Sequence, residues 1–299
     1  MRPVNWCGHP KTHRSIIRRV ETSPRSRYVQ RNQGAERVGQ ILEILSLANR
    51  PLALQELSGA LGLHASTAHR LLKTLEDEGL IARADGTELY RLGPTILRLS
   101  SRMLSQFPVR DVAAPHLYRL SLDLGMTVSL STYDDGYITY LDCKESPEPI
   151  HIVLRAGGTA PAHCIPSGWV QLAYLGDGEI DRLAERGLCP YGSGKPVDLD
   201  ELKQHLGDVR ARGYATGGDW LPGVEGVAVA ILDGAERPLA AISTIAFAGQ
   251  LDAAKIPDMV AAMRHAADEV AARLGISPPV RSAGLRPITE HAAHLDTSH

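Results

Sequence analysis

The sequence predicts an α+β protein of two domains, a small helical domain followed by a larger domain built on an antiparallel sheet. Its 299 residues are enough for two domains of ordinary size. Near the N-terminus, three short helical patterns lie within about 45 residues. After residue 108, strand patterns come as locally paired hairpins with helical patterns around them. This order favours an antiparallel α+β sheet over a doubly wound parallel one.

Composition and cysteine usage bound the class of protein. No stretch approaches the roughly 18 consecutive apolar residues of a membrane helix, and no apolar segment follows the N-terminal charges as a secretory signal requires. The four cysteines (Cys7, Cys143, Cys164 and Cys189) are scattered and form no C-x-x-C pair. They predict neither a zinc ribbon nor a disulfide framework, and they favour a reducing, cytoplasmic location. We expect no metal, no cofactor and no membrane partner.

The charge is unevenly distributed along the chain. Residues 1–100 contain 15 Lys and Arg against 9 Asp and Glu, whereas residues 101–299 contain 17 against 25. This asymmetry indicates a polyanionic partner for the front part only. Much of the positive excess lies in residues 1–34, which lack apolar periodicity and are predicted to be a basic, disordered tail. Residues 276–299, with three prolines, are predicted to be a second disordered tail.

The first two helical patterns have clear apolar faces and clear ends. In "ERVGQILEILSLAN" the apolar residues follow the i, i+3, i+4, i+7 spacing of an amphipathic helix: Val38, Ile41, Leu42 and Leu45. The second pattern, "LALQELSGALGL", ends at Gly62, a residue suited to a left-handed helix cap.

The third helical pattern, "STAHRLLKTLED", has two different faces. Ala68, Leu71, Leu72 and Leu75 form its apolar face, and Ser66 or Thr67 is expected to cap it. The other face consists of Ser66, Thr67, His69, Arg70 and Lys73. The free N–H groups and positive dipole end of a helix N-terminus suit a phosphate, and small hydroxyl side chains extend this site. Arg70 has the fork geometry for a bidentate contact with guanine.

A β-hairpin follows these helices. "LIARADGTELYRL" is typical of a strand, an Asp-Gly turn and a second strand, with Arg83 and Arg91 as candidate phosphate contacts. Residues 35–93 are therefore predicted to form a winged helix-turn-helix domain that places its third helix in the major groove of double-stranded DNA.

The stretch from 94 to 108 predicts a linker helix. Its apolar residues Ile96, Leu99 and Met103 lie on one face and have no partner in the preceding domain. We expect this stripe to serve in dimerisation.

Residues 109–275 are predicted to form the α+β domain. "TVSLSTYDDGYITYLDC" indicates a hairpin, "IHIVLRAG" a further strand, and "GVAVAILDGAERPLAAISTIA" a second, hydrophobic hairpin. Helical patterns cover 167–175, 178–187 and 199–212, and an alanine-rich helix closes the domain at 252–274.

The run from "RVGQILEIL" through "STAHRLLKTLEDEGLI" to "YRLGPTIL" resembles the isocitrate-lyase-regulator (IclR) family of bacterial transcription factors. The resemblance continues in "GGTAPAHC", "RARGYA" and "PGVEGVAVAILD" and covers roughly residues 36–274. It implies a homodimer or dimer of dimers that binds a pseudo-palindromic operator. It also implies that the second domain is GAF-like and binds a small-molecule effector, and that such regulators control catabolic operons.

The resemblance also implies an effector pocket. The matching positions, together with neighbours where this chain departs from the family, are Gly158, Thr159, His163, Ser167, Asp219, Gly226 and Ser243. Gly226 stands where the family often has a cysteine, and Ile245 where it has a second serine. Gly217 replaces a common acidic residue, with Asp219 displaced from that place. Fewer polar groups favour a larger, less polar effector than glyoxylate or pyruvate, such as an aromatic or long-chain acid.

Two other classes of function stay open from the residues alone. A GAF-like domain could process a small molecule with His163 and Cys164, although adjacent residues on a strand point to opposite faces and share a proton poorly. The chain has no G-x-S-x-G, H-E-x-x-H or P-loop motif. A cysteine redox sensor using Cys143 or Cys164 is the third reading.

Overall fold

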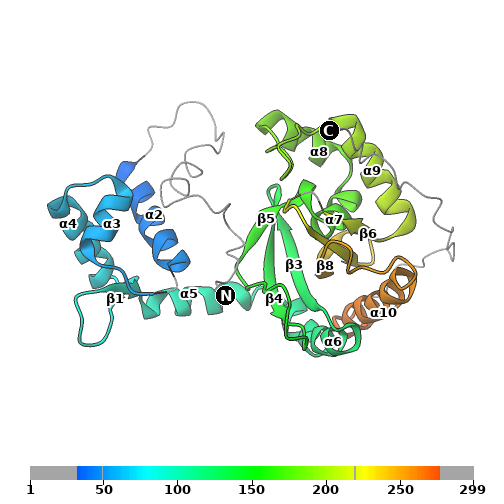
Figure 1. Cartoon of the computed structure of the whole chain (residues 1–299), viewed down its shortest axis with the longest axis horizontal. Helices are drawn as coiled ribbons and strands as arrows, with labels where there is room; N and C mark the ends of the chain where they lie inside the picture. The colour runs from blue at the N-terminus through cyan, green and yellow to red at the C-terminus, as the bar shows by residue number, and fades with distance from the viewer. Residues whose placement is uncertain (1–31, 49, 219, 277–299) are drawn as a thin grey trace. The chain divides into compact units, whose positions relative to one another are not determined.

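The computed structural model describes residues 32–48, 50–218 and 220–276. The chain divides after Pro108 into two compact units (Figure 1), and each is described by itself. The predicted fold class is confirmed, since a helical unit with a two-stranded sheet precedes an α+β unit with a six-stranded sheet. Within the described ranges, no helix is long and apolar enough to cross a bilayer.

The first unit is assembled from short elements around one small core. They are α2 (Gln33–Leu47), α3 (Leu54–Leu61), α4 (Ala65–Asp77), β1 (Ile81–Arg83), β2 (Tyr90–Leu92) and α5 (Pro94–Leu104). The core consists of the buried side chains Ile41, Leu45, Leu52, Leu57, Leu72, Leu75, Ile81 and Tyr90. Its helical members lie at the apolar positions of the three helical patterns, and Ile81 and Tyr90 come from the two strands of the wing.

The helix ends correct the sequence reading in two places. Helix α2 starts at Gln33, so Gln33 and Gly34 are helical although they were predicted to belong to the tail. The side chain of Asn32 caps this helix by accepting hydrogen bonds from the N–H groups of Gly34 and Ala35. Gly62 caps α3 in the left-handed conformation, as predicted. The N-cap of α4, however, is His64, which has extended backbone, so Ser66 and Thr67 lie inside the first turn and cap nothing.

The second unit is a six-stranded antiparallel sheet covered by helices. Its strands are β3 (Thr127–Asp134), β4 (Tyr137–Lys144), β5 (Thr159–Pro161), β6 (Ala215–Gly217), β7 (Val224–Leu232) and β8 (Pro238–Phe247), in the order β5-β4-β3-β8-β7-β6. Its helices are α6 (Pro108–Leu124), η1 (Ala162–Cys164), α7 (Pro166–Leu175), α8 (Asp177–Arg186), α9 (Leu199–Arg212) and α10 (Ile256–Arg273).

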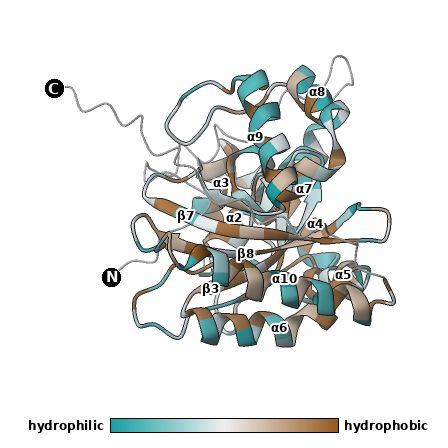
Figure 2. Ribbon diagram, turned by 90° about the vertical axis from the view of Figure 1, so that its right-hand side faces the viewer, coloured by the Kyte–Doolittle hydropathy of each residue, from teal (hydrophilic) through white to brown (hydrophobic). Residues whose placement is uncertain are grey.

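The helices lie in two layers on the two faces of the sheet. Helix α7 packs on β7 and β8, and α8 and α9 pack on α7, whereas α10 packs on β7 from the side where α6 also lies (Figure 2). We call the face towards α7 and α8 the inner face. Tyr133 of β3 identifies it, because its hydroxyl contacts Glu179 of α8. Alternate residues of a strand share a face, so Thr127 and Ser129 also lie on the inner face.

One predicted strand is absent. The stretch "IHIVLRAG" has the alternating burial of a strand at Ile152 and Leu154, yet its backbone is irregular. It ends in a turn at which the Gly157 N–H donates to the Tyr140 carbonyl and the Tyr140 N–H to the Gly158 carbonyl. Only the three residues of β5 then join the sheet. Alternating burial alone does not prove strand pairing, since a segment packed over a sheet shows it too.

Candidate DNA interface and ligand site

Helix α4 separates its polar and apolar residues as the sequence predicted. The five side chains of the predicted contact face are exposed: Ser66, Thr67, His69, Arg70 and Lys73. Ala68, Leu72 and Leu75 are buried on the opposite side of the helix. The face is therefore exposed to solvent and not packed within its own unit.

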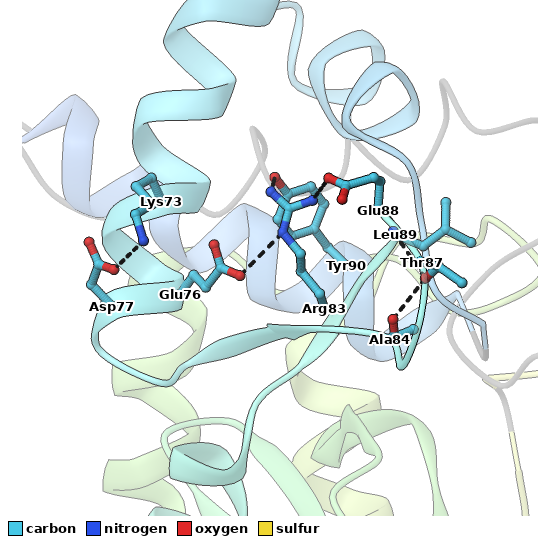
Figure 3. A network of polar contacts seen from close by, with 9 residues as sticks. All are labelled: Lys73, Glu76, Asp77, Arg83, Ala84, Thr87, Glu88, Leu89 and Tyr90. Carbon is cyan, nitrogen blue, oxygen red and sulfur yellow. Dashed lines mark hydrogen bonds and ion pairs between the residues drawn. The ribbon is translucent and has the colours of Figure 1, made fainter.

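The acidic C-terminal turn of α4 is balanced by two ion pairs (Figure 3). The Lys73 Nζ lies 2.6 Å from Asp77 Oδ1, and Arg83 Nε lies 3.3 Å from Glu76 Oε1. Carboxylates at the C-terminus of a helix are unfavourable for the helix dipole. Here the two cations offset that disadvantage, and the Lys73–Asp77 pair also raises the pKa of Lys73.

Arg83, a predicted phosphate contact, has partners within its own unit. Its guanidinium contacts Glu88, donates to the Tyr90 hydroxyl at 3.1 Å, and lies 4.8 Å from the centre of the Tyr90 ring (Figure 3). With Glu76 on its other side, it ties β1 and β2 to α4. The turn between the strands carries Asp85 and Glu88, so the wing presents carboxylates. Arg91, by contrast, is exposed on β2.

The predicted dimerisation stripe lies on α5. In this helix, which is described in full, no residue is buried within the chain. Leu99 and Met103 are each 53% exposed and Ile96 is partly exposed. Leu97, which the sequence reasoning missed, is 71% exposed. Large apolar side chains on one helix at this exposure are typical of an interface.

The predicted effector residues fall into separate sets of contacts. The Ser243 hydroxyl on β8 lies 2.9 Å from that of Ser129 on β3, and both are buried on the inner face. Gly226 is paired with Ile245 on the adjacent strand. A Cβ on Gly226 would lie 2.4 Å from the Thr244 carbonyl oxygen, so the cysteine common in the family does not fit here without a strand shift.

The remaining predicted effector residues lie elsewhere. Thr159 is exposed on β5, beside Gly158 at the turn before it. Ser167 is buried in the first turn of α7, where its carbonyl accepts a hydrogen bond from Gln171. Asp219 lies outside the described residues.

A cavity of about 340 Å³ opens at one end of the inner face. Its walls are Gly125, Met126, Thr127, Ser146, Glu148, Pro149, Ile150, His151, Ile152, Ile245, Ala246, Phe247 and Gln250. The lining includes none of the described residues that were predicted to bind the effector. It does include Ile245, the neighbour of Ser243 on the same face of β8, and the irregular segment that was predicted as a strand.

Most of the polar groups that line this cavity form hydrogen bonds with other residues of the lining. The Thr127 hydroxyl donates to the Ile152 carbonyl at 2.7 Å and accepts from the Ser146 N–H at 3.2 Å. His151 contacts the Glu148 carbonyl through Nδ1 at 2.6 Å. The lining also includes the polar side chains of Glu148 and Gln250, and five large apolar ones: Met126, Ile150, Ile152, Ile245 and Phe247. The apolar part suits a ligand with an apolar body.

His163 and Cys164 do not lie on a strand. They belong to η1, and both are buried. The prediction that they point to opposite faces is therefore wrong, because a 3₁₀ turn does not alternate its side chains across a sheet. A third residue, Cys189 of the segment between α8 and α9, joins them: its Sγ lies 3.7 Å from His163 Nε2.

The cysteines differ sharply in acidity. A hydrogen bond from the Cys164 thiol, with one from His163, lowers the pKa of Cys189 to about 5 against the opposing effect of its partial burial. Burial, with the nearby Asp142 carboxylate, raises the pKa of Cys143 to about 12. These surroundings favour the thiolate form of Cys189 and the neutral thiol form of Cys143. This could not be predicted from the sequence, because Cys189 has no motif around it.

Comparison with known proteins matches both units of the chain. Residues 34–85 match the IclR helix-turn-helix domain, and residues 101–272 match the C-terminal domain of bacterial IclR transcriptional regulators. A probable transcriptional regulator, SauR, of Cupriavidus necator is 31% identical over 243 residues, which are 80% of this chain and 96% of that protein. The transcriptional repressor IclR of Escherichia coli is 27% identical over 86% of this chain and 94% of its own length.

Solved structures agree with this. An IclR transcriptional regulator from Alicyclobacillus acidocaldarius is 26% identical and superposes with a TM-score of 0.67, covering 81% of this chain and 98% of its own. The IclR of Thermotoga maritima, at 24% identity, has the same fold with a TM-score of 0.67. On the matches to both domain models and the identity to SauR over most of its length, the chain belongs to the IclR family of bacterial transcriptional regulators.

Proposed function

We propose that this regulator binds a pseudo-palindromic operator as a homodimer or dimer of dimers and releases or reshapes that contact when a small organic acid or aromatic compound binds its second domain. The observation that carries the DNA part is the exposed face of α4, where three cationic or imidazole groups and two hydroxyls stand opposite a buried apolar face. The proposal places the protein in the cytoplasm, controlling a catabolic operon. A relative from Streptomyces coelicolor, 29% identical over 81% of this chain, is named as a glycerol operon regulatory protein, which supports the last point.

In this proposal α4 enters the major groove N-terminus first. Ser66 and Thr67 then lie near a phosphate together with the free N–H groups of the first turn. Arg70, one turn further on, reaches guanine O6 and N7. Lys73 and the exposed Arg91 supply phosphate contacts, and His69 lines the same face. The direct test is a mobility-shift titration with the DNA upstream of this gene and of its neighbours.

Replacing Arg70 with alanine is expected to weaken operator binding by about 1–3 kcal/mol and to relax the base preference at one position of each half-site. The reason is that a bidentate contact to one base is lost. Titration of a set of operators with single base changes measures both effects. A folded Arg70→Ala protein with the wild-type titration curve would remove Arg70 from the base-reading set.

Lys73→Ala serves as the matched control on the same face. Loss of a phosphate contact should weaken binding to all sequences similarly and lower the slope of log K against log salt by about one unit. Because Lys73 is paired with Asp77, the change also leaves that carboxylate unbalanced near the DNA. Sequence-selective loss in Lys73→Ala would show that the phosphate assignment is wrong.

We infer that the effector binds in the cavity at the end of the inner face. The apolar part of its lining, which includes Ile152, Ile245 and Phe247, suits the body of an aromatic or long-chain acid. The Ser129–Ser243 hydroxyl pair lies next along the same two strands, since Thr127 and Ile245 at the cavity are themselves a cross-strand pair. Binding there would shift the balance between arrangements of the two DNA-binding domains by linkage.

Filling the cavity should abolish the effector response. Ile245→Trp adds an indole to the wall, so the effector is expected to lose at least about tenfold in affinity, while operator binding without effector stays unchanged. A panel of aromatic and aliphatic acids, screened by thermal shift on the wild type, supplies the ligand for calorimetry. Ser243→Ala is the companion variant. Loss confined to Ser243→Ala would move the pocket to the serine pair, away from the cavity.

A further inference from the structure

We propose that His163, Cys164 and Cys189 form a binding site for a thiophilic transition-metal ion of the zinc class. One donor atom from each residue lies within 4.8 Å of the other two. Two sulfurs and an imidazole nitrogen are the donors that zinc and similar ions prefer, whereas magnesium and calcium take oxygen ligands. The chemistry of the three side chains therefore selects the class of ion.

The spacing is close to that of an occupied site. With zinc–sulfur bonds of about 2.3 Å and zinc–nitrogen bonds of about 2.0 Å, tetrahedral geometry puts sulfur about 3.5 Å from nitrogen and about 3.8 Å from a second sulfur. The Cys189 Sγ is already 3.7 Å from His163 Nε2. A contraction of about 1 Å at most completes the set. Cys189 lies in the irregular segment between α8 and α9, so it moves without disturbing a helix or strand.

The nitrogen of His163 that faces the sulfurs is Nε2, which lies 3.7 Å from the Cys189 Sγ. The same atom lies 2.9 Å from the Cys189 carbonyl oxygen, and because a carbonyl only accepts, Nε2 carries the proton in that contact. Binding of a metal ion through Nε2 therefore displaces this proton, as metal binding to a protonated ligand does in general. The other ring nitrogen, Nδ1, is buried and has no hydrogen-bond partner among the described residues, so the proton can move there without breaking another contact.

The surroundings hold two of the three ligands in place. The Trp169 indole donates to the His163 carbonyl at 2.7 Å, which fixes η1 against α7. Three protein donors leave a fourth position for water or a small ligand, as in sites where the metal exchanges or reacts. The ion would join the segment after α8 to η1.

The test uses the full-length protein, reduced and freed of metal with a chelator, then titrated with Co²⁺ and afterwards with Zn²⁺. Thiolate ligation of Co²⁺ gives near-ultraviolet charge-transfer absorption that histidine or carboxylate ligation lacks. We expect one Co²⁺ per chain with this absorption, displaced by Zn²⁺. The readout does not depend on DNA or effector, so its failure would leave the proposed regulatory function standing.

Cys189→Ser is the informative variant, because its half-buried side chain allows the protein to fold. It should reduce the charge-transfer absorption and weaken Zn²⁺ binding by at least about 100-fold. Cys143→Ser, on β4 and outside the cluster, is the matched control and should keep the wild-type spectrum and affinity. Far-ultraviolet circular dichroism checks that both variants are folded.

Two outcomes would overturn the site. One is a wild-type protein without thiolate charge transfer, and the other is a Cys189→Ser protein with an unchanged Co²⁺ spectrum. If the wild type binds no metal but mass spectrometry finds a Cys164–Cys189 disulfide after treatment with a hydroperoxide, the pair is a redox pair and the metal site is rejected.

Discussion

Replacing Leu99 with aspartate is expected to convert the proposed dimer to a monomer and to remove most of the operator affinity. Leu99 is 53% exposed on α5, on the same side of the helix as Ile96 and the equally exposed Met103. If the stripe is buried between subunits, the variant places an unpaired charge in that contact, at a cost of about 3–5 kcal/mol. Subunit affinity should fall at least about 100-fold. A monomer engages only one half-site at a time, so operator affinity falls with it.

Sedimentation velocity across a range of protein concentrations measures the first effect, and a mobility shift on the intact operator measures the second. Ser101→Asp is the matched control, since it adds the same charge to the same helix about 200° away around its axis. It should leave the oligomer intact. A Leu99→Asp protein that sediments like the wild type would place the dimer contact on another surface.

The first unit could be predicted closely because its signals are local and agree with one another. The apolar spacing of α2, α3 and α4, the left-handed cap at Gly62 and the turn of the wing each specify the same arrangement. The prediction that failed in this unit was the N-cap of α4, because several neighbouring residues are suitable caps. Ser66 and Thr67 are both good caps, yet the N-cap is His64, two or three residues earlier, where the backbone is extended.

The ligand-binding side of the molecule was harder to predict, because it depends on residues far apart in the chain. Nothing near Cys189 marks it as a neighbour of His163, 26 residues earlier, and no periodicity reveals a 3₁₀ turn at Ala162–Cys164. Arg83 was assigned from its charge alone, whereas its partners Glu76 and Glu88 decide its role. One wall of the cavity is formed by an irregular segment that the alternating pattern had placed in the sheet.

The junction between η1 and α7 is held by a close backbone contact that only glycine permits. A Cβ on Gly168 would lie 2.0 Å from the Ala162 carbonyl oxygen and 2.4 Å from its Cα. Both of those atoms belong to the backbone, so neither can rotate away as a side chain would. Helix α7 sits on the sheet through β7 and β8, which limits its own freedom to retreat. The same junction presents His163 and Cys164.

Gly168→Ala is therefore expected to destabilise the second unit by about 3 kcal/mol or more, the upper range for overpacking. For a domain of this size, the midpoint of thermal unfolding should fall by about 6–12 °C. Gly207→Ala is the matched control with the opposite sign, because it lies inside α9 and a Cβ there meets nothing within 4 Å among the described residues. Alanine favours the helix by about 0.5–1 kcal/mol, so that midpoint should rise slightly. Equal midpoints for Gly168→Ala and the wild type, measured by circular dichroism, would mean that η1 and α7 are not in contact as described.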